Sequence, residues 1–178
     1  MKLKLRQERL SDHSAIAALI LGAYRDISYS NHKEQIMVER LRNSDAFIPA
    51  LSIVAENDNQ DLVGHILFTK IQIRNQGQSY QALALAPLSV DPRYQKKGIG
   101  KKLVLEGHRV AKELGYNYVI VLGIPNYYPK FEYQFISKFN VSLPIKISDE
   151  NALIVFLIKN NYLEITGGTV IYSEAFFG

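Results

Sequence analysis

The sequence LSVDPRYQKKGIG, residues 88–100, lies between an apolar run and an amphipathic segment. Pro92 cannot donate to a sheet ladder and biases Asp91 away from helical angles, so we predict that residues 82–90 form a strand that ends here. A helix beginning near Gly100 would present N–H groups that have no partner within the helix and lie at the positive end of its dipole. Glycines let this backbone approach an anion closely, and lysines add positive charge. The stretch therefore predicts a strand, a loop that holds a phosphate-bearing ligand, and a helix.

The glycine spacing excludes two well-known phosphate loops. Gly98 and Gly100 are two residues apart and no Ser or Thr follows the lysines, so the loop is not G-x-x-x-x-G-K-[ST]. Residue 103 is leucine, which excludes G-x-G-x-x-G. The pattern that remains is Q-x-x-G-x-G, which starts at Gln95. Its place between an apolar strand and a helix favours a ligand loop over a plain turn.

Length and composition predict one globular domain over residues 1–178, without a disulfide framework or a metal site. The chain has no cysteine, which also excludes a Cys nucleophile, and its four histidines lack ligand spacing. No stretch approaches the roughly 20 apolar residues of a membrane span. Polar residues 8–13 separate the N-terminal basic residues from the next apolar run, which does not fit a signal peptide. We therefore expect a cytoplasmic protein with no membrane partner.

The positive charge is concentrated around the loop. The net charge is +4, but between Arg93 and Lys112 the basic residues are opposed only by Glu106. This distribution indicates a localised anion site. A nucleic-acid surface would need a longer basic footprint with interleaved aromatic residues, and only Tyr94 qualifies. A small polyphosphate ligand is therefore favoured, and no nucleic-acid partner is expected.

Periodicity and turn signals predict the order of the elements. The chain starts with a short strand near residues 2–6 and helices near 12–23 and 31–41, followed by an antiparallel meander of strands at 51–56, 62–73 and 80–90. The loop and its helix come next, and the helix ends at Gly115. A parallel strand at 118–122, a short helix or turn at 123–131, and strands at 152–159 and 169–172 complete the order. Asn31 and Glu34 resemble a capping box for the second helix. Gly107 lies within the buried stripe of the loop helix, where it costs about 1 kcal/mol relative to Ala. We therefore expect that helix to approach the sheet closely.

The motif and this order resemble the GNAT N-acetyltransferase superfamily. Three segments are similar to a bacterial branch of predicted N-acetyltransferases: LAPLSVDPRYQKKGIG at 85–100, VLGIPNYYPKF at 121–131, and GTVIY at 168–172. The resemblance covers nearly the whole chain and is weakest over residues 135–150. It implies an α/β (α+β) GNAT fold, with a central mixed, mostly antiparallel sheet of about seven strands flanked by helices.

The same resemblance implies that acetyl-coenzyme A binds as the acyl-donor co-substrate. In this family pattern, the backbone of Leu88, Ser89 and Val90 pairs with the pantetheine arm, beside a splay between the two parallel strands. The pyrophosphate would be held by the N–H groups of Gln95, Lys96, Lys97, Gly98, Ile99, Gly100 and Lys101. The N–H group near Val90 would stabilise the oxyanion.

Tyr128 aligns with the family's tyrosine that lies four residues before a Gly-Phe pair, and the resemblance implies that it is the catalytic acid. A phenol, with a pKa of about 10, can protonate a departing thiolate, whose thiol has a pKa of about 8.5. Here the pair is Glu132-Tyr133, so the turn after Tyr128 is expected to differ. Tyr127 is the alternative acid.

The general base stays open among His65, Glu56, His32 and a chain of water molecules. The resemblance places the acceptor groove at residues 24–32 and 160–168. It implies an N-acetyltransferase that acts on a primary amine of a small molecule or protein. A non-catalytic acyl-coenzyme A sensor or interaction module on the same fold is the alternative. The acceptor, and whether the protein is a monomer or a homodimer, are not set by the sequence.

Overall fold

The computed structural model describes residues 1–178 and contains one mixed sheet of eight strands. The strands are β1 (Lys4–Gln7), β2 (Phe47–Glu56), β3 (Leu62–Asn75), β4 (Gln78–Val90), β5 (Tyr118–Leu122), β6 (Gln134–Phe135), β7 (Ala152–Phe156) and β8 (Thr169–Ile171). Their order is β1-β2-β3-β4-β5-β7-β6, and β8 pairs with the far half of β3. Only β4 and β5 are parallel. The predicted meander and the predicted parallel strand after the loop helix are confirmed.

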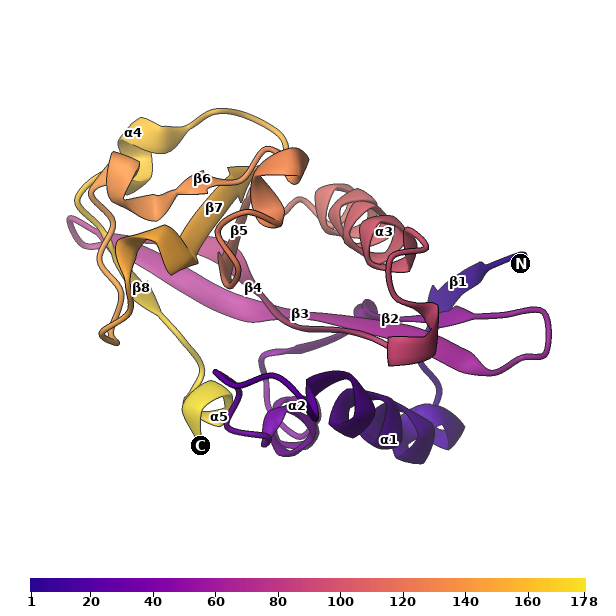
Figure 1. The fold of residues 1–178 in the computed structure, drawn as a ribbon. Helices are drawn as coiled ribbons and strands as arrows, with labels where there is room; N and C mark the ends of the chain where they lie inside the picture. The colour runs from indigo at the N-terminus through magenta and orange to yellow at the C-terminus, as the bar shows by residue number, and fades with distance from the viewer.

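The helices cover both faces of this sheet. They are α1 (His13–Tyr24), α2 (Glu34–Arg42), α3 (Ile99–Glu113), α4 (Tyr162–Ile165) and α5 (Glu174–Phe177), with 3₁₀ turns that include η2 (Pro92–Tyr94) and η3 (Tyr128–Phe131). In Figure 1, α3 lies on one side of the long β3–β4 hairpin, and α1, α2 and α5 lie on the other. None of the helices combines the length and the hydropathy that crossing a bilayer requires.

Each face of the sheet has its own apolar core. On the α1 face, Ile16 and Ile20 of α1 and Leu41 of α2 are fully buried, in the spacing that the sequence predicted for α1. On the α3 face, Leu103 and Val104 pack over the sheet. Burying such side chains stabilises the fold by about 1.5–3 kcal/mol each, which fixes the positions of α1 and α3 relative to β4.

Helix α3 approaches the sheet most closely at Gly107. A β-carbon at this position would lie 2.1 Å from Cε2 of Phe68, whose ring is fully buried on β3. No real β-carbon contact is this short, so any larger residue forces α3 or the ring to move. The close approach predicted from the sequence is confirmed, and it explains a glycine within the helix.

Two predicted boundaries are wrong for reasons that local patterns do not show. Strand β7 ends at Phe156 rather than Lys159, because the Asn117 side chain accepts hydrogen bonds from the N–H groups of Ile158 and Lys159 and turns the chain. Strand β2 begins at Phe47 rather than Leu51. A register shift interrupts its pairing with β3, and the first residues of β2 pair with β3 again on the other side of that shift.

We expect Gly107→Ala to lower the free energy of unfolding by about 1–3 kcal/mol, because overpacking against Phe68 outweighs the gain in helix propensity. Urea denaturation of both proteins measures the difference. Gly22→Ala is the matched control: Gly22 also lies in a helix, but a β-carbon there has no neighbour within 4 Å. This control should be neutral or stabilising by up to about 1 kcal/mol. A Gly107→Ala protein as stable as the control would contradict the close-packing account.

Candidate functional site

The candidate site begins where β4 leaves β5. The two strands pair only over residues 82–85 of β4, although β4 continues along β3 to Val90. The register between β3 and β4 shifts at this point, with one additional residue on β4 at the cis Ala86–Pro87 step. Beyond Leu85, the edge of β4 that faced β5 therefore has no neighbouring strand.

The hydrogen-bond alternation of the β3–β4 ladder decides which groups face this gap. Asp91 donates its N–H to the Val63 carbonyl at 3.0 Å, so Ser89, two residues earlier, also points its backbone groups toward β3. Leu88 and Val90 consequently turn their backbone groups toward the gap. Of the three residues that the sequence named together, these two provide an open edge, whereas the Ser89 backbone belongs to the ladder.

Two side chains already bond the carbonyls on this edge. The Tyr24 hydroxyl donates to the Leu88 carbonyl at 3.1 Å, and Nε2 of Gln95 donates to the Val90 carbonyl at 3.2 Å. Gln95 therefore ties the loop to the end of β4 rather than extending into the space above it. The N–H groups of Leu88 and Val90 stay available to a ligand.

The loop after β4 presents a continuous run of unpaired backbone donors. No N–H group from Gln95 to Lys101 donates to a backbone carbonyl, because α3 begins only at Ile99 and its first internal bonds are made further on. Lys96 (φ 60°) and Gly98 (φ 80°) adopt left-handed backbone angles that curl the loop around the start of α3. A β-carbon at Gly98 would have no neighbour within 4 Å, so the loop is not covered by other parts of the chain at this residue.

Ion pairs neutralise part of the positive charge that the sequence concentrates between Arg93 and Lys112. Arg93 pairs with Asp91, and Arg109 pairs with Glu106 and Glu113. The exposed lysines at the loop and the start of α3, Lys96, Lys97, Lys101 and Lys102, form no ion pair; Lys112, near the end of α3, is also exposed and forms none. Ile99 is buried and contributes only its backbone. The unpaired positive charge therefore surrounds the unpaired N–H groups.

Tyr127 and Tyr128 pack against each other, with ring centroids 5.1 Å apart. The Tyr128 ring is buried, and a β-carbon at Gly100 in the first turn of α3 would lie 2.6 Å from the Tyr127 hydroxyl. Burial raises the pKa of Tyr128, and the charges that Tyr24, Tyr127 and Tyr29 would carry raise it further. Tyr128 is therefore a buried, protonated hydroxyl, whereas the Tyr127 hydroxyl lies against the start of α3.

At the Glu132-Tyr133 pair, a non-glycine residue takes the left-handed backbone angle that glycine adopts most readily. Glu132 adopts a left-handed φ of 70° and donates its N–H to the Pro129 carbonyl. Tyr133 is buried against Tyr128, and its hydroxyl pairs with Nε2 of His108 at 2.9 Å. The altered pair therefore fixes the Tyr128 ring by packing.

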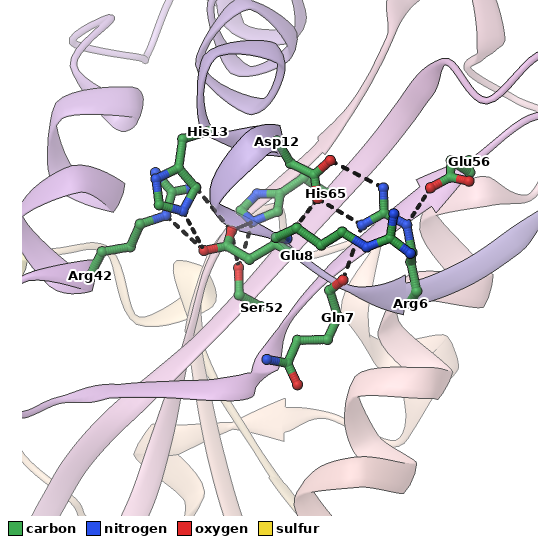
Figure 2. A network of polar contacts seen from close by, with 10 residues as sticks. Arg6, Gln7, Glu8, Asp12, His13, Arg42, Ser52, Glu56 and His65 are labelled. Carbon is green, nitrogen blue, oxygen red and sulfur yellow. Dashed lines mark hydrogen bonds and ion pairs between the residues drawn. The ribbon is translucent and has the colours of Figure 1, made fainter.

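Two of the candidate bases, His65 and Glu56, take part in a polar network under α1 (Figure 2). His65 is fully buried; its Nε2 lies 3.0 Å from the Ser52 hydroxyl and 3.6 Å from the Glu8 carboxylate, which also pairs with Arg42. Burial lowers the pKa of His65, although Glu8 opposes this shift. Burial alone would raise the pKa of Glu8, but its bonds to His65, Arg42 and Ser52 hold it well below the usual value. This cluster joins β1, β2, β3 and α2.

The candidate base Glu56 pairs with Arg6, which also binds Asp12 (Figure 2). It therefore serves to fasten β1 to β2 and to the start of α1. His32, the third candidate base, is exposed in the connection between α1 and α2. It has a left-handed φ of 59° and lines a hollow beside Glu34.

The proposed contribution of residues 160–168 to an acceptor groove is wrong. Asn75, at the tip of the β3–β4 hairpin, donates to the carbonyls of Glu164 and Thr166, and Tyr118 at the start of β5 binds Glu164. This segment is thus fixed at the N-terminal ends of β4 and β5, whereas the gap opens at their C-terminal ends. Figure 1 shows α4 beside the hairpin tip, away from η2.

The sequence placed Tyr24 in the acceptor groove by resemblance but did not predict its hydrogen bond to the edge of β4. Tyr24 continues the buried stripe of α1, one turn beyond Ile20, and this spacing was the available signal. Burial raises the pKa of Tyr24, and the nearby Glu34 charge raises it further. Glu34 does not form the predicted capping box with Asn31: Ser30 donates to its carboxylate, while Asn31 accepts from the Lys33 N–H.

Known proteins share this architecture. The family model described as the acetyltransferase (GNAT) family matches residues 18–128. The chain is 30% identical over 149 residues, 84% of this chain and 86% of the relative, to the uncharacterized N-acetyltransferase YhbS of Escherichia coli strain K12. The crystal structure of Escherichia coli YhbS in complex with CoA has a TM-score of 0.86 at 27% identity, covering 100% of this chain and 93% of that chain. A GNAT family acetyltransferase from Brucella melitensis in complex with acetyl-CoA has a TM-score of 0.79 at 30% identity over 98% of both chains. The chain therefore belongs to the GNAT acetyltransferase family.

Proposed function

We propose that this protein transfers the acetyl group of acetyl-CoA directly to a primary amine of a small molecule or protein. The observation that carries the proposal is the open edge of β4 leading into the run of unpaired N–H groups from Gln95 to Lys101. These are the donors that an extended amide-bearing arm and a pyrophosphate require. The solved relatives bound to CoA and acetyl-CoA support this choice of ligand.

Each part of the site has a proposed role. The backbone groups of Leu88 and Val90, next to Ser89, pair with the pantetheine arm. The N–H groups of Gln95, Lys96, Lys97, Gly98, Ile99, Gly100 and Lys101 hold the pyrophosphate, and the unpaired lysines add long-range attraction. Gln95 acts also through its side chain, by holding the loop against Val90.

Two groups take part in the proposed reaction: a backbone N–H on the edge of β4 and the Tyr128 hydroxyl. Acetyl-CoA supplies a thioester whose carbonyl carbon is attacked by the neutral amine nitrogen. A backbone N–H at the gap, near Val90, donates to the carbonyl oxygen as negative charge develops on it. As the carbon–sulfur bond breaks, Tyr128 donates its proton to the departing sulfur, and the proton that the attacking nitrogen loses passes through water and restores the Tyr128 hydroxyl, so that the products are the amide and the free thiol of CoA. Burial favours this role, because the raised pKa of Tyr128 keeps it protonated at neutral pH.

The first test concerns the phosphate loop. We expect the parent protein to bind acetyl-CoA with a dissociation constant on the order of micromolar, and Gly98→Glu to weaken binding by about a hundredfold or more. The new carboxylate would face the pyrophosphate, and like charges in contact cost several kcal/mol. Isothermal titration calorimetry measures both affinities.

Gly77→Glu is the matched control for this variant. Gly77 lies in the β3–β4 turn with a φ of 78° and open space around its β-carbon position, so it imposes the same backbone strain and charge away from the site. It should bind acetyl-CoA like the parent. Equal binding by Gly98→Glu, or no binding by the folded parent, would overturn the cofactor assignment.

The second test concerns the acid. Tyr128→Phe should lower kcat for acetylation of an amine by about a hundredfold or more and leave the affinity for acetyl-CoA unchanged. Tyr127→Phe should lower kcat less than tenfold, since the Tyr127 hydroxyl lies against α3. The parent's kcat should lose this acid only as the pH rises through the raised pKa of Tyr128, well above neutrality.

A steady-state pH profile with an amine panel measures these effects. Equal losses in both phenylalanine variants would contradict the assignment of Tyr128. A protein that binds acetyl-CoA and acetylates no amine would instead be an acyl-coenzyme A sensor.

A further inference from the structure

Helix α3 makes one side-chain hydrogen bond to another part of the chain, and it does so at His108. Nε2 of His108 lies 2.9 Å from the hydroxyl of Tyr133, which follows η3. The other side-chain hydrogen bonds of α3 stay within the helix. The helix whose first turn belongs to the phosphate loop is therefore tied at this one point to the segment that carries Tyr128.

This hydrogen bond decides where the Tyr133 ring lies. Tyr133 is buried, with 3% of its surface exposed, and its hydroxyl has no other hydrogen-bond partner. Burying a hydroxyl costs free energy unless the group is hydrogen-bonded, so the bond to His108 keeps Tyr133 against α3. A phenylalanine at this position would fill the same space without that constraint.

The His108 ring is itself held in place by packing. It lies edge-on to Phe68 and Phe131, with ring centroids 6.2 and 6.5 Å away. Phe68 is also the ring against which Gly107 packs, so the close approach of α3 to the sheet sets the position of the imidazole. Burial lowers the pKa of His108 to about 4, which keeps the ring neutral at neutral pH. A neutral imidazole can pair with a phenol without burying a charge.

The Tyr133 ring in turn packs against Tyr128. Their ring centroids lie 5.4 Å apart, at an interplanar angle of 68°. A β-carbon at Gly123 would lie 2.7 Å from Cε2 of Tyr128, so the Tyr128 ring also rests against the backbone that follows β5. The Tyr128 hydroxyl makes no hydrogen bond within the protein, so these packing neighbours and Tyr127 set its direction.

We infer that His108 is a positioning residue for the proposed acid Tyr128, and that it acts through its hydrogen bond to Tyr133. The inference rests on the proposed function and adds the residue that aligns its proton donor. Because His108 belongs to α3, the helix whose start would hold the pyrophosphate also sets the direction of the phenol. A shift of about 1 Å in a reacting group can lower a rate by about a hundredfold. Loss of this bond should therefore slow the reaction and leave cofactor binding intact.

The test removes the bond from each side and measures kcat with the amine that the parent acetylates fastest, together with the dissociation constant for acetyl-CoA. We expect Tyr133→Phe and His108→Leu each to lower kcat about tenfold and to keep the dissociation constant within about twofold of the parent's. Since both changes break one bond, the double variant should lose no more than either single variant. His108→Gln offers an amide in place of Nε2 and should restore kcat to within about twofold of the parent's.

Tyr172→Phe is the matched control, because it removes a buried tyrosine hydroxyl that has no hydrogen-bond partner and whose ring packs against Phe176 and Phe177. It should keep the parent's kcat, and thermal melting should show that every variant is folded. An unchanged kcat in Tyr133→Phe, additive losses in the double variant, or no recovery in His108→Gln would overturn the inference.

Failure of the proposed function has a different signature. It would appear as no acetylation by the parent, or as full kcat in Tyr128→Phe, and it would overturn the role of His108 as well. A large loss of kcat in Tyr128→Phe beside an unchanged kcat in both Tyr133→Phe and His108→Leu would overturn the role of His108 alone.

Discussion

After Leu85, β4 separates from β5, and the candidate site is built around the backbone edge that this separation exposes. A strand inside a sheet normally has both edges paired, and an edge left open is a site for another strand. Here β4 runs past the end of its parallel pairing with β5 and exposes the backbone of Leu88 and Val90. The same strand then delivers the chain to the start of α3, where more donors are unpaired. The close packing of Gly107 on Phe68 holds α3 against the sheet and so fixes where the donors at its start lie relative to β4.

The start of α3 and the nearby tyrosines offer different chemistry. At the start of α3, backbone donors and lysines without ion pairs offer positive charge and no acceptor, which suits a polyphosphate. Tyr24 and Tyr128 are hydroxyls whose pKa values burial raises, so both stay protonated. The Tyr24 hydroxyl donates to the Leu88 carbonyl and thereby leaves the N–H groups of that edge of β4 open.

The sequence predicted the parts of the fold that local patterns determine, and it failed where distant residues decide. The strand, loop and helix around Gly98 follow from proline, glycine and apolar periodicity, and Gly107 correctly indicated a close approach. The end of β7 did not follow, because it is set by Asn117 in another segment. Residues 160–168 were assigned to the wrong end of the sheet because their anchor, Asn75, lies in a distant turn. The spacing of Asn31 and Glu34 fits a capping box, but the Ser30 hydroxyl binds the carboxylate instead.

The contact between Ser30 and Glu34 matters for the chemistry, because the partners of each carboxylate determine whether it holds the fold together or stays unpaired. Glu8 is surrounded by Arg42, Ser52 and His65, and Glu56 is paired with Arg6, so both stabilise the joining of the first three strands to the helices. His65 is neutral and enclosed in the same network. Glu34 forms neither an ion pair nor a helix cap, since one of its oxygens accepts from Ser30 and the other has no hydrogen-bond partner. Burial and pairing thus assign Glu8, Glu56 and His65 to joining the strands and helices, and they leave the edge of β4 and the start of α3 as the places where unpaired backbone donors gather.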